Sequence, residues 1–310
     1  MTSSSYRKAP KHPFPAGVHD CVNVTTHLLK EGHKYGIDVN RIGVAGDSAG
    51  GNLAAVVALQ VGEIKRRGSD SQRKDTLPSL KYQALFYPLL QAVDFWLPSY
   101  VYNNDVTPSL LNRNFITYLL AMYFGLGSSN ATHYGNIMAK GGHIPLHVRE
   151  EYSKHVNRSR LFVNQIPGAP SSGRENPASQ NGYQQGKSRD SLDPYATVPA
   201  GSKGVTVDWE THNLLAHQIS DPMFSPLFST NVSQAPPTFL HVAEFDVLRD
   251  EGLLYAQKLR AAGVHVVTFY SIGGVHGEIT KHGFSLLEFK RGDVALQKMF
   301  SFVNETLRAL

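Results

Sequence analysis

Hydrophobic positions along the chain follow a helical spacing in some segments and form short continuous runs in others. Within residues 17–34, apolar side chains recur near helical spacing. The next segment, "DVNRIGVAG" (38–46), is a short apolar run that ends in glycine. This order predicts a helix, then a buried strand, then a tight turn. Residues 52–65 are rich in alanine, leucine and valine, which favours a helix. "LKYQALFYPLL" (80–90) is typical of a strand covered on both faces.

The same order of strand and helix returns near the C-terminus. "PPTFLHVAEFD" (236–246) predicts a strand, "EGLLYAQKLRAAG" (251–263) a helix closed by its last glycine, and "HVVTFYSIGG" (265–274) another strand. An amphipathic helix is predicted from about 293 to 310. Strands separated by helices predict an α/β fold with a mainly parallel sheet covered by helices.

The middle of the chain has a different pattern. Residues 92–164 carry aromatic and helical patterns such as "FITYLLAMYF" without further alternation of strand and helix, which predicts a helical lid insertion. Residues 165–204 are dense in proline, glycine, serine, asparagine and glutamine, so we expect a disordered loop there. The predicted domains are therefore a core from 1–91 and 205–310, and a lid insertion over 92–204.

Composition excludes several classes of protein. The net charge of +5 comes from scattered basic residues, and the run at 65–74 is typical of a solvated helix end and loop, so we expect no nucleic-acid partner. The single cysteine, Cys21, excludes an internal disulfide framework and is expected to be buried. No apolar run approaches the ~20 residues that cross a bilayer, so no anchor is visible in this chain.

The segment "GVAGDSAGGN" (43–52) contains the first candidate for chemistry. It has the form G-x-S-x-G around Ser48, and small flanking residues let a strand turn sharply into a helix and leave the hydroxyl exposed. The predicted strand before it and the predicted helix after it supply that context. We interpret Ser48 as a nucleophile, and the backbone N–H of Ala49 as an oxyanion donor.

A serine nucleophile requires a base and an acid that orients the base. Asp246 ends one late predicted strand and His276 directly follows the next, so both belong at the same edge of a parallel sheet. Two other acids compete: Glu244 would point to the opposite face of its strand, and Asp250 would lie in the first turn of the next helix. His282 competes as the base.

Several of these segments resemble one protein family. "YRKAPKHPFPAG", "GDSAGGN", "DPMFSPLF", "AEFDVLRDEG" and "VHGE" occur in the order found in the hormone-sensitive-lipase group of α/β hydrolases. "HDCVNVTTHLLKEGHKYGIDVNRIGVAGDSAGG" and "EYSKHVN" resemble its arylacetamide deacetylase-like branch. The resemblance implies an α/β-hydrolase fold and a Ser48–His276–Asp246 triad. It implies a carboxylesterase or deacetylase that cleaves esters or amides with small aromatic or lipid-like acyl groups, without a metal or organic cofactor.

The chain departs from the family pattern in two ways. Family members carry a His-Gly-Gly-Gly loop upstream of the serine that supplies oxyanion donors, and no such run occurs here. A catalytically impaired hydrolase-like protein that binds a ligand or partner is therefore an alternative. If "YRKAP" follows the family's fourth strand, the first half of the sheet is missing, so we hypothesise an N-terminally truncated product. For a full-length form the resemblance implies association with the endoplasmic reticulum membrane.

Aromatic residues of the predicted lid are candidates for binding an acyl group. Phe95, Trp96 and Phe124 are expected to shape an apolar pocket, and the alternative is that they form the core of the lid. In a third interpretation, Trp96 and Phe124 bind a membrane surface.

Overall fold

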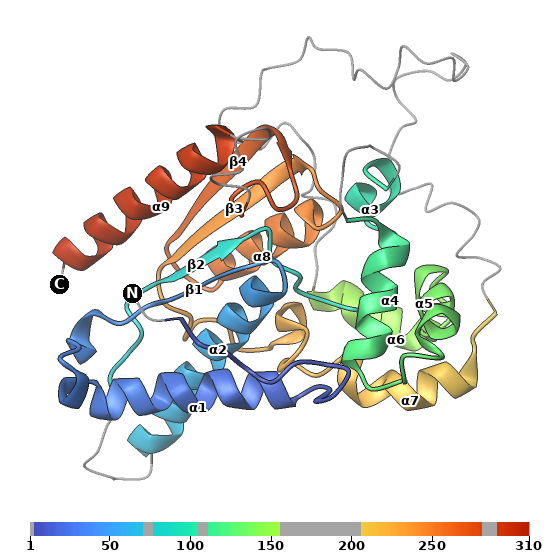
Figure 1. Ribbon diagram of the computed structural model, residues 1–310, viewed down its shortest axis with the longest axis horizontal. Coiled ribbons are helices and arrows are strands. Elements are labelled where there is room, and N and C mark those ends of the chain that lie inside the picture. The colour runs from blue at the N-terminus through green and yellow to red at the C-terminus, as the bar shows by residue number, and fades with distance from the viewer. Residues whose placement is uncertain (1–2, 71–76, 105–110, 156–205, 281–289, 310) are drawn as a thin grey trace.

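In the part of the chain that the structure describes, four parallel strands form the sheet (Figure 1). The computed structural model describes residues 3–70, 77–104, 111–155, 206–280 and 290–309. Within these residues the strand order is β1 (Val44–Asp47), β2 (Gln83–Phe86), β3 (Thr238–Phe245) and β4 (Val266–Val275). Val44 pairs with Gln83, Gln83 with Thr238, and Thr238 with Val266. The predicted parallel sheet is confirmed.

Helices connect the strands as the sequence predicts. Helix α1 (Ala16–Glu31) precedes β1, α2 (Ala49–Asp70) joins β1 to β2, α8 (Arg249–Ala261) joins β3 to β4, and α9 (Lys290–Arg308) follows β4. The long segment between β2 and β3 contains α3 (Pro98–Tyr102), α4 (Arg113–Tyr123), α5 (Ala131–Ala139), α6 (Leu146–His155) and α7 (Trp209–Ile219). Short 3-10 helices lie at Gly32–Tyr35, Val39–Arg41 and Pro226–Phe228.

The two faces of the sheet are covered by different helices. Successive side chains of a strand point to opposite faces. Leu85 and Leu240 therefore join a cluster with residues of α2 and α8, whereas Phe86 and Phe239 join a cluster with α9, including Met299. Both faces are thus buried, which accounts for the nearly continuous apolar character of β2 in the sequence.

Strand β1 differs from the buried strand that residues 38–46 predict. It begins at Val44, because residues 39–41 form a 3-10 helix in which Asp38 accepts a hydrogen bond from the N–H of Asn40 at 2.9 Å. Three of its four residues are half-buried and Ala45 is exposed. Within the described residues β1 is an edge strand, which explains this exposure.

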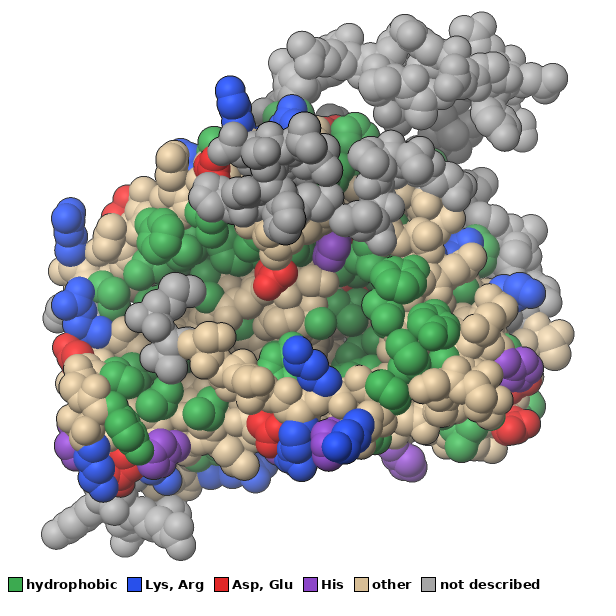
Figure 2. Space-filling view, viewed as in Figure 1, with side chains coloured by type: hydrophobic (Ala, Val, Ile, Leu, Met, Phe, Trp, Pro, Cys, Tyr) green, Lys and Arg blue, Asp and Glu red, His purple; other side chains and the backbone are tan. Residues whose placement is uncertain are grey.

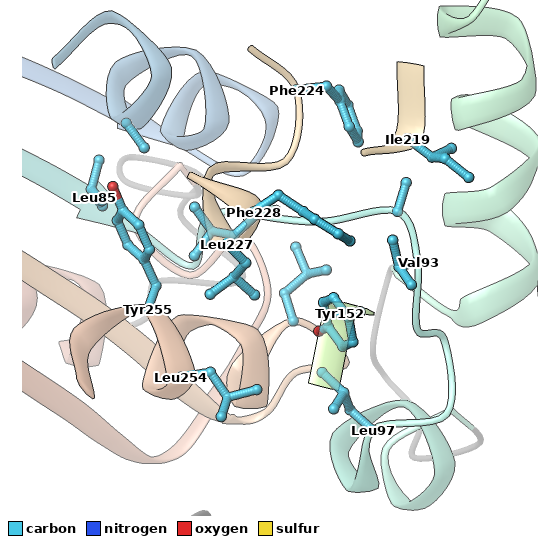
Figure 3. Packing of buried hydrophobic residues seen from close by; sticks show 14 of the residues in the cluster. Leu85, Val93, Leu97, Tyr152, Ile219, Phe224, Leu227, Phe228, Leu254 and Tyr255 are labelled. Carbon is cyan, nitrogen blue, oxygen red and sulfur yellow. The ribbon is translucent and has the colours of Figure 1, made fainter. Parts of the chain in front are cut away.

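Helices α3–α7 lie together beyond the carboxyl ends of β1 and β2 (Figure 1). Their apolar side chains share one cluster with the sheet. In Figure 3, Phe228 extends toward Val93 of this region, and its ring lies 5.4 Å from that of Tyr152 between centroids. Leu97 and Ile219 belong to the same cluster. The division into core and lid stays a prediction, and the predicted disordered loop at 165–204 lies outside the described residues.

Two further observations concern the described part of the chain. No helix in it combines the length and apolar character needed to cross a membrane. Cys21 is buried and free, as the sequence predicts.

Candidate active site

Ser48 lies at a sharp turn between β1 and α2. Its φ of 53° is in the left-handed region that non-glycine residues seldom adopt, and its N–H donates to the carbonyl of Phe86 at 2.9 Å. The turn brings neighbouring backbone close, since a Cβ on Gly46 would lie only 2.1 Å from the carbonyl oxygen of Gly50. Glycine is therefore needed two residues before the serine.

Asp246 directly follows β3 and is fully buried. One carboxylate oxygen, Oδ1, accepts from the N–H of Leu248 at 2.9 Å, and the side-chain amide of Asn103 donates to the Asp246 carbonyl at 2.9 Å. The second carboxylate oxygen, Oδ2, lies 2.8 Å from Nδ1 of His276. The loop that holds the acid is thus bound both by its own backbone and by the residue that follows α3.

His276 follows β4 at a point where the pairing with β3 is irregular. Ala243 pairs with Ser271 but Phe245 pairs with Val275, so two steps along β3 match four steps along β4. A bulge of this kind bends a strand and changes the direction of the side chains beside it. It directly precedes His276, the residue that lies over the serine.

The three predicted residues form one chain of hydrogen bonds. His276 Nε2 lies 2.9 Å from Ser48 Oγ, and Nδ1 lies 2.8 Å from Asp246 Oδ2. Because a carboxylate only accepts, Nδ1 carries the proton and Nε2 accepts from the hydroxyl. The ring of Tyr87 packs against the imidazole with 4.7 Å between centroids. In this arrangement the imidazole can take the hydroxyl proton and the acid can stabilise the resulting cation.

The alternative candidates for the acid make contacts outside this chain of hydrogen bonds. Glu244 accepts from the N–H of Gly273 at 2.6 Å and so binds the bulged part of β4. Asp250 lies in the first turn of α8 and pairs with Arg249 at 2.8 Å. His282 lies outside the described residues.

The predicted oxyanion donor lies at a helix start. Ala49 is the first residue of α2, where backbone N–H groups lack partners within the helix. This position suits the predicted role, which stays a prediction. Among the residues that the structure describes, no group of three histidine, cysteine, aspartate or glutamate side chains could hold a metal ion.

The three aromatic candidates for substrate binding have different surroundings. Phe95 and Phe124 are buried in the main apolar cluster, whereas Trp96 is half-buried, with the guanidinium of Arg113 lying 4.3 Å from the centre of its ring. Buried packing is what the alternative interpretation as lid core predicts, and a role in binding substrate stays a prediction. Figure 2 shows hydrophobic side chains gathered around a hollow between the strand ends and α4.

A buried carboxyl lies near the acid loop. Glu251, in the first turn of α8, accepts from the N–H of Leu90 at 2.7 Å, from the amide of Gln91 at 2.8 Å and from the hydroxyl of Tyr100 at 3.3 Å. Burial raises the pKa of Glu251 to about 8, and these hydrogen bonds oppose the rise. The glutamate joins the loop after β2, and the helix α3 beyond it, to α8.

Sequence reasoning did not identify several residues that hold the site. Tyr87 packs on the imidazole, Asn103 binds the acid loop, and His241 pairs with Glu278 beneath the histidine turn. Only Glu278 had a local signal, since it lies within "VHGE". The other three are brought to the site by long-range packing, which spacing along the chain does not encode.

Comparison with protein families gives the context for this geometry. A family model described as the α/β hydrolase fold matches residues 1–148 and 176–280. The chain belongs to the α/β hydrolase family. The predicted fold class and the resemblance to this family are confirmed.

Named relatives of this α/β hydrolase cover most of the chain. Arylacetamide deacetylase-like 3 of Homo sapiens is 32% identical over 300 residues, which is 96% of this chain and 62% of that protein. Neutral cholesterol ester hydrolase 1 of Bos taurus is 34% identical over 281 residues, which is 89% of this chain and 58% of that protein. Arylacetamide deacetylase of Oryctolagus cuniculus is 30% identical over 288 residues, covering 92% and 61%. The chain thus spans about three-fifths of the length of these relatives.

Solved structures support the fold. A hyperthermophilic esterase from the archaeon Pyrobaculum calidifontis superposes with a TM-score of 0.58 at 23% identity, covering 98% of this chain and 65% of that one. EstE1, a thermophilic carboxylesterase from a metagenomic library, superposes with a TM-score of 0.56 at 23% identity, covering 96% of this chain and 67% of that one. At this level of identity the similarity shows a shared fold.

Proposed function

We propose that this chain is a serine hydrolase that cleaves carboxylic esters. The observation that carries the proposal is the hydrogen-bond chain from Ser48 Oγ through the imidazole of His276 to the carboxylate of Asp246. Each member follows a strand that ends at the same edge of the sheet, and the half-buried serine sits in a strained turn. The names of the relatives, which include deacetylases and an ester hydrolase, agree with this class of reaction.

The geometry supports the following steps. Ser48 Oγ attacks the carbonyl carbon of the ester while His276 Nε2 takes its proton, and Asp246 stabilises the imidazolium. The imidazolium then gives that proton to the departing alcohol, which leaves an acyl-serine. Water, activated by the same imidazole, releases the acid and restores the serine. The N–H of Ala49 stabilises the oxyanion in both halves of the reaction.

The proposed substrates are esters of apolar acids, with small aromatic or lipid-like acyl groups. The hydrophobic side chains around the hollow in Figure 2 suit an apolar acyl chain. The arylacetamide deacetylases among the relatives make arylacetamides a second candidate class. Comparing hydrolysis of p-nitrophenyl butyrate with that of 4-nitroacetanilide separates the two classes, because both release a coloured product.

Hydrolysis of p-nitrophenyl butyrate by the purified chain tests the proposal. We expect Ser48→Ala to reduce the rate close to the background of the buffer, since Ser48 Oγ is the atom that attacks the ester in the proposed steps. Ser301→Ala, an exposed serine on α9, serves as the matched control and should keep the wild-type rate. Hydrolysis that survives Ser48→Ala, or a folded wild-type chain that hydrolyses nothing, contradicts the proposal.

A further inference from the structure

A buried ionisable pair joins the middle of β3 to the turn that carries His276. His241, in the middle of β3, places Nε2 at 2.8 Å from Oε1 of Glu278, and both side chains are fully buried. Because the carboxylate only accepts, the imidazole N–H donates. The ring of His241 is stacked on Phe269 at 5.6 Å and meets Tyr87 edge-on at 5.4 Å. The position of the imidazole is therefore fixed by its neighbours.

Glu278 also binds the main chain on the other side of the histidine. Its Oε2 accepts from the N–H of Val275 at 3.3 Å, and its own N–H donates to the Val275 carbonyl at 3.3 Å. A Cβ on Gly274 would lie 2.7 Å from Oε2, so glycine is what admits the carboxylate here. The carboxylate thus links Val275, immediately before His276, to β3.

The Glu278 carboxylate supports the end of β4 at a place where the pairing of the strands is irregular. The bulge in β4 disrupts the regular ladder just before Val275, so the strand alone holds the end of β4 less firmly. Catalysis depends on holding His276 within hydrogen-bond distance of both Ser48 and Asp246, and an error of about 1 Å lowers the rate strongly. A buried carboxylate with two donors is a rigid support, because moving it would leave charge and donors unpaired.

We infer that His241 and Glu278 are positioning residues, a brace that sets the place of the His276 imidazole between the serine and the acid. They are positioning residues because neither touches the reacting atoms. The inference rests on the proposed function and deepens it. Tyr87 completes the support, since its ring packs on both imidazoles.

Kinetics of Glu278→Ala test the brace. We expect kcat for p-nitrophenyl butyrate to fall about 100-fold, with KM within about twofold of wild type, because the base is displaced while the binding surface stays. His241→Phe keeps an aromatic ring, removes the donor and should show the same split between kcat and KM. A folded Glu278→Ala variant that keeps wild-type kcat overturns the inference.

A matched control separates positioning from loss of stability. Thr238→Val removes two buried side-chain hydrogen bonds, one accepted from Gln83 at 2.8 Å and one donated to the carbonyl of Pro236 at 2.9 Å. They lie at the far end of β3, roughly 25 Å along the strand from the acid. It should lower the melting temperature and leave kcat unchanged. An equal loss of kcat in Thr238→Val and Glu278→Ala would mean that the pair acts only through stability, which overturns the inference.

A spectroscopic readout keeps this test independent of hydrolysis. The Nδ1 proton of His276, hydrogen-bonded to Asp246, should give a downfield proton NMR signal, assigned by its loss in His276→Gln. We expect the signal in the wild type and in Thr238→Val, and its shift or disappearance in Glu278→Ala. If the wild type hydrolyses no ester, the proposed function fails while this signal still decides the brace. An unchanged signal in Glu278→Ala overturns it.

Discussion

At the scale of single residues, local pattern and long-range contact contribute differently to the site. The place of Ser48 in a strand-to-helix turn was predictable, because such a turn requires small neighbours close in sequence, as the crowding at Gly46 shows. Asp246 and His276 were predictable because each directly follows a strand. His241 and Asn103 were not, since their roles depend on contacts with residues far along the chain.

Glu251 leads to a prediction about pH. Its pKa is about 8 in the folded chain and near 4.5 when unfolded, so the unfolded state loses its proton first as pH rises. The contribution of Glu251 to stability is therefore present below about pH 4.5 and is lost as pH rises through about 8. We expect the unfolding free energy of the wild type, minus that of Glu251→Gln, to decrease between these values and to level off above pH 8.

Urea unfolding at intervals from pH 5 to 9 measures that difference. Glu150→Gln, at an exposed position on α6, is the control for replacing a carboxyl by an amide without burial. A constant difference for Glu251→Gln would show that burial does not raise this pKa in solution.

At the scale of elements, the order of strands and helices followed from hydrophobic pattern, while the exact ends did not. The apolar run at 38–46 contains only a short strand, because Asp38 starts a 3-10 helix and β1 is at an edge. The bulge in β4 also has little local signal, because Gly273 and Gly274 suit a turn as readily as a strand. Tertiary pairing decides both features.

Helix α3 provides a prediction at this scale. The amide of Asn103, the residue after the helix, donates to the carbonyls of Glu244 at 3.0 Å and Asp246 at 2.9 Å. Asn103→Ala would leave both carbonyls short of a donor, so we expect about 1–3 kcal/mol lower stability and a lower kcat through a looser acid loop. Asn136→Ala, on an exposed position of α5, should change neither quantity. Unaltered kcat in a measurably destabilised Asn103→Ala would show that α3 does not support the acid.

At the scale of the whole molecule, the helices between β2 and β3 and the sheet share one apolar cluster. Phe95, Ile116 and Tyr152 belong to the same cluster as Leu85 and Leu240 of the sheet. Contiguous burial of this kind favours unfolding in a single step. The sequence predicted two regions by their patterns, but pattern alone does not encode how tightly such regions pack together.

Urea unfolding followed by two probes tests whether the helices between β2 and β3 unfold together with the sheet. Both tryptophans, Trp96 and Trp209, lie in the segment between β2 and β3, so their fluorescence reports on it, while circular dichroism reports on all helices and strands. We expect the two urea transitions to coincide. A fluorescence transition at clearly lower urea would mean that α3–α7 unfold as a separate unit.

In the proposed function, His276 and Asp246 make Ser48 nucleophilic. Intact-mass and peptide mass spectrometry after exposure to an alkyl fluorophosphonate measures this directly, since the reagent phosphorylates an activated serine and releases fluoride. We expect one adduct per chain, at Ser48, absent in Ser48→Ala and at least about 100-fold slower to form in His276→Gln. No adduct on the folded wild type, an adduct at another residue, or equal rates in His276→Gln would contradict it.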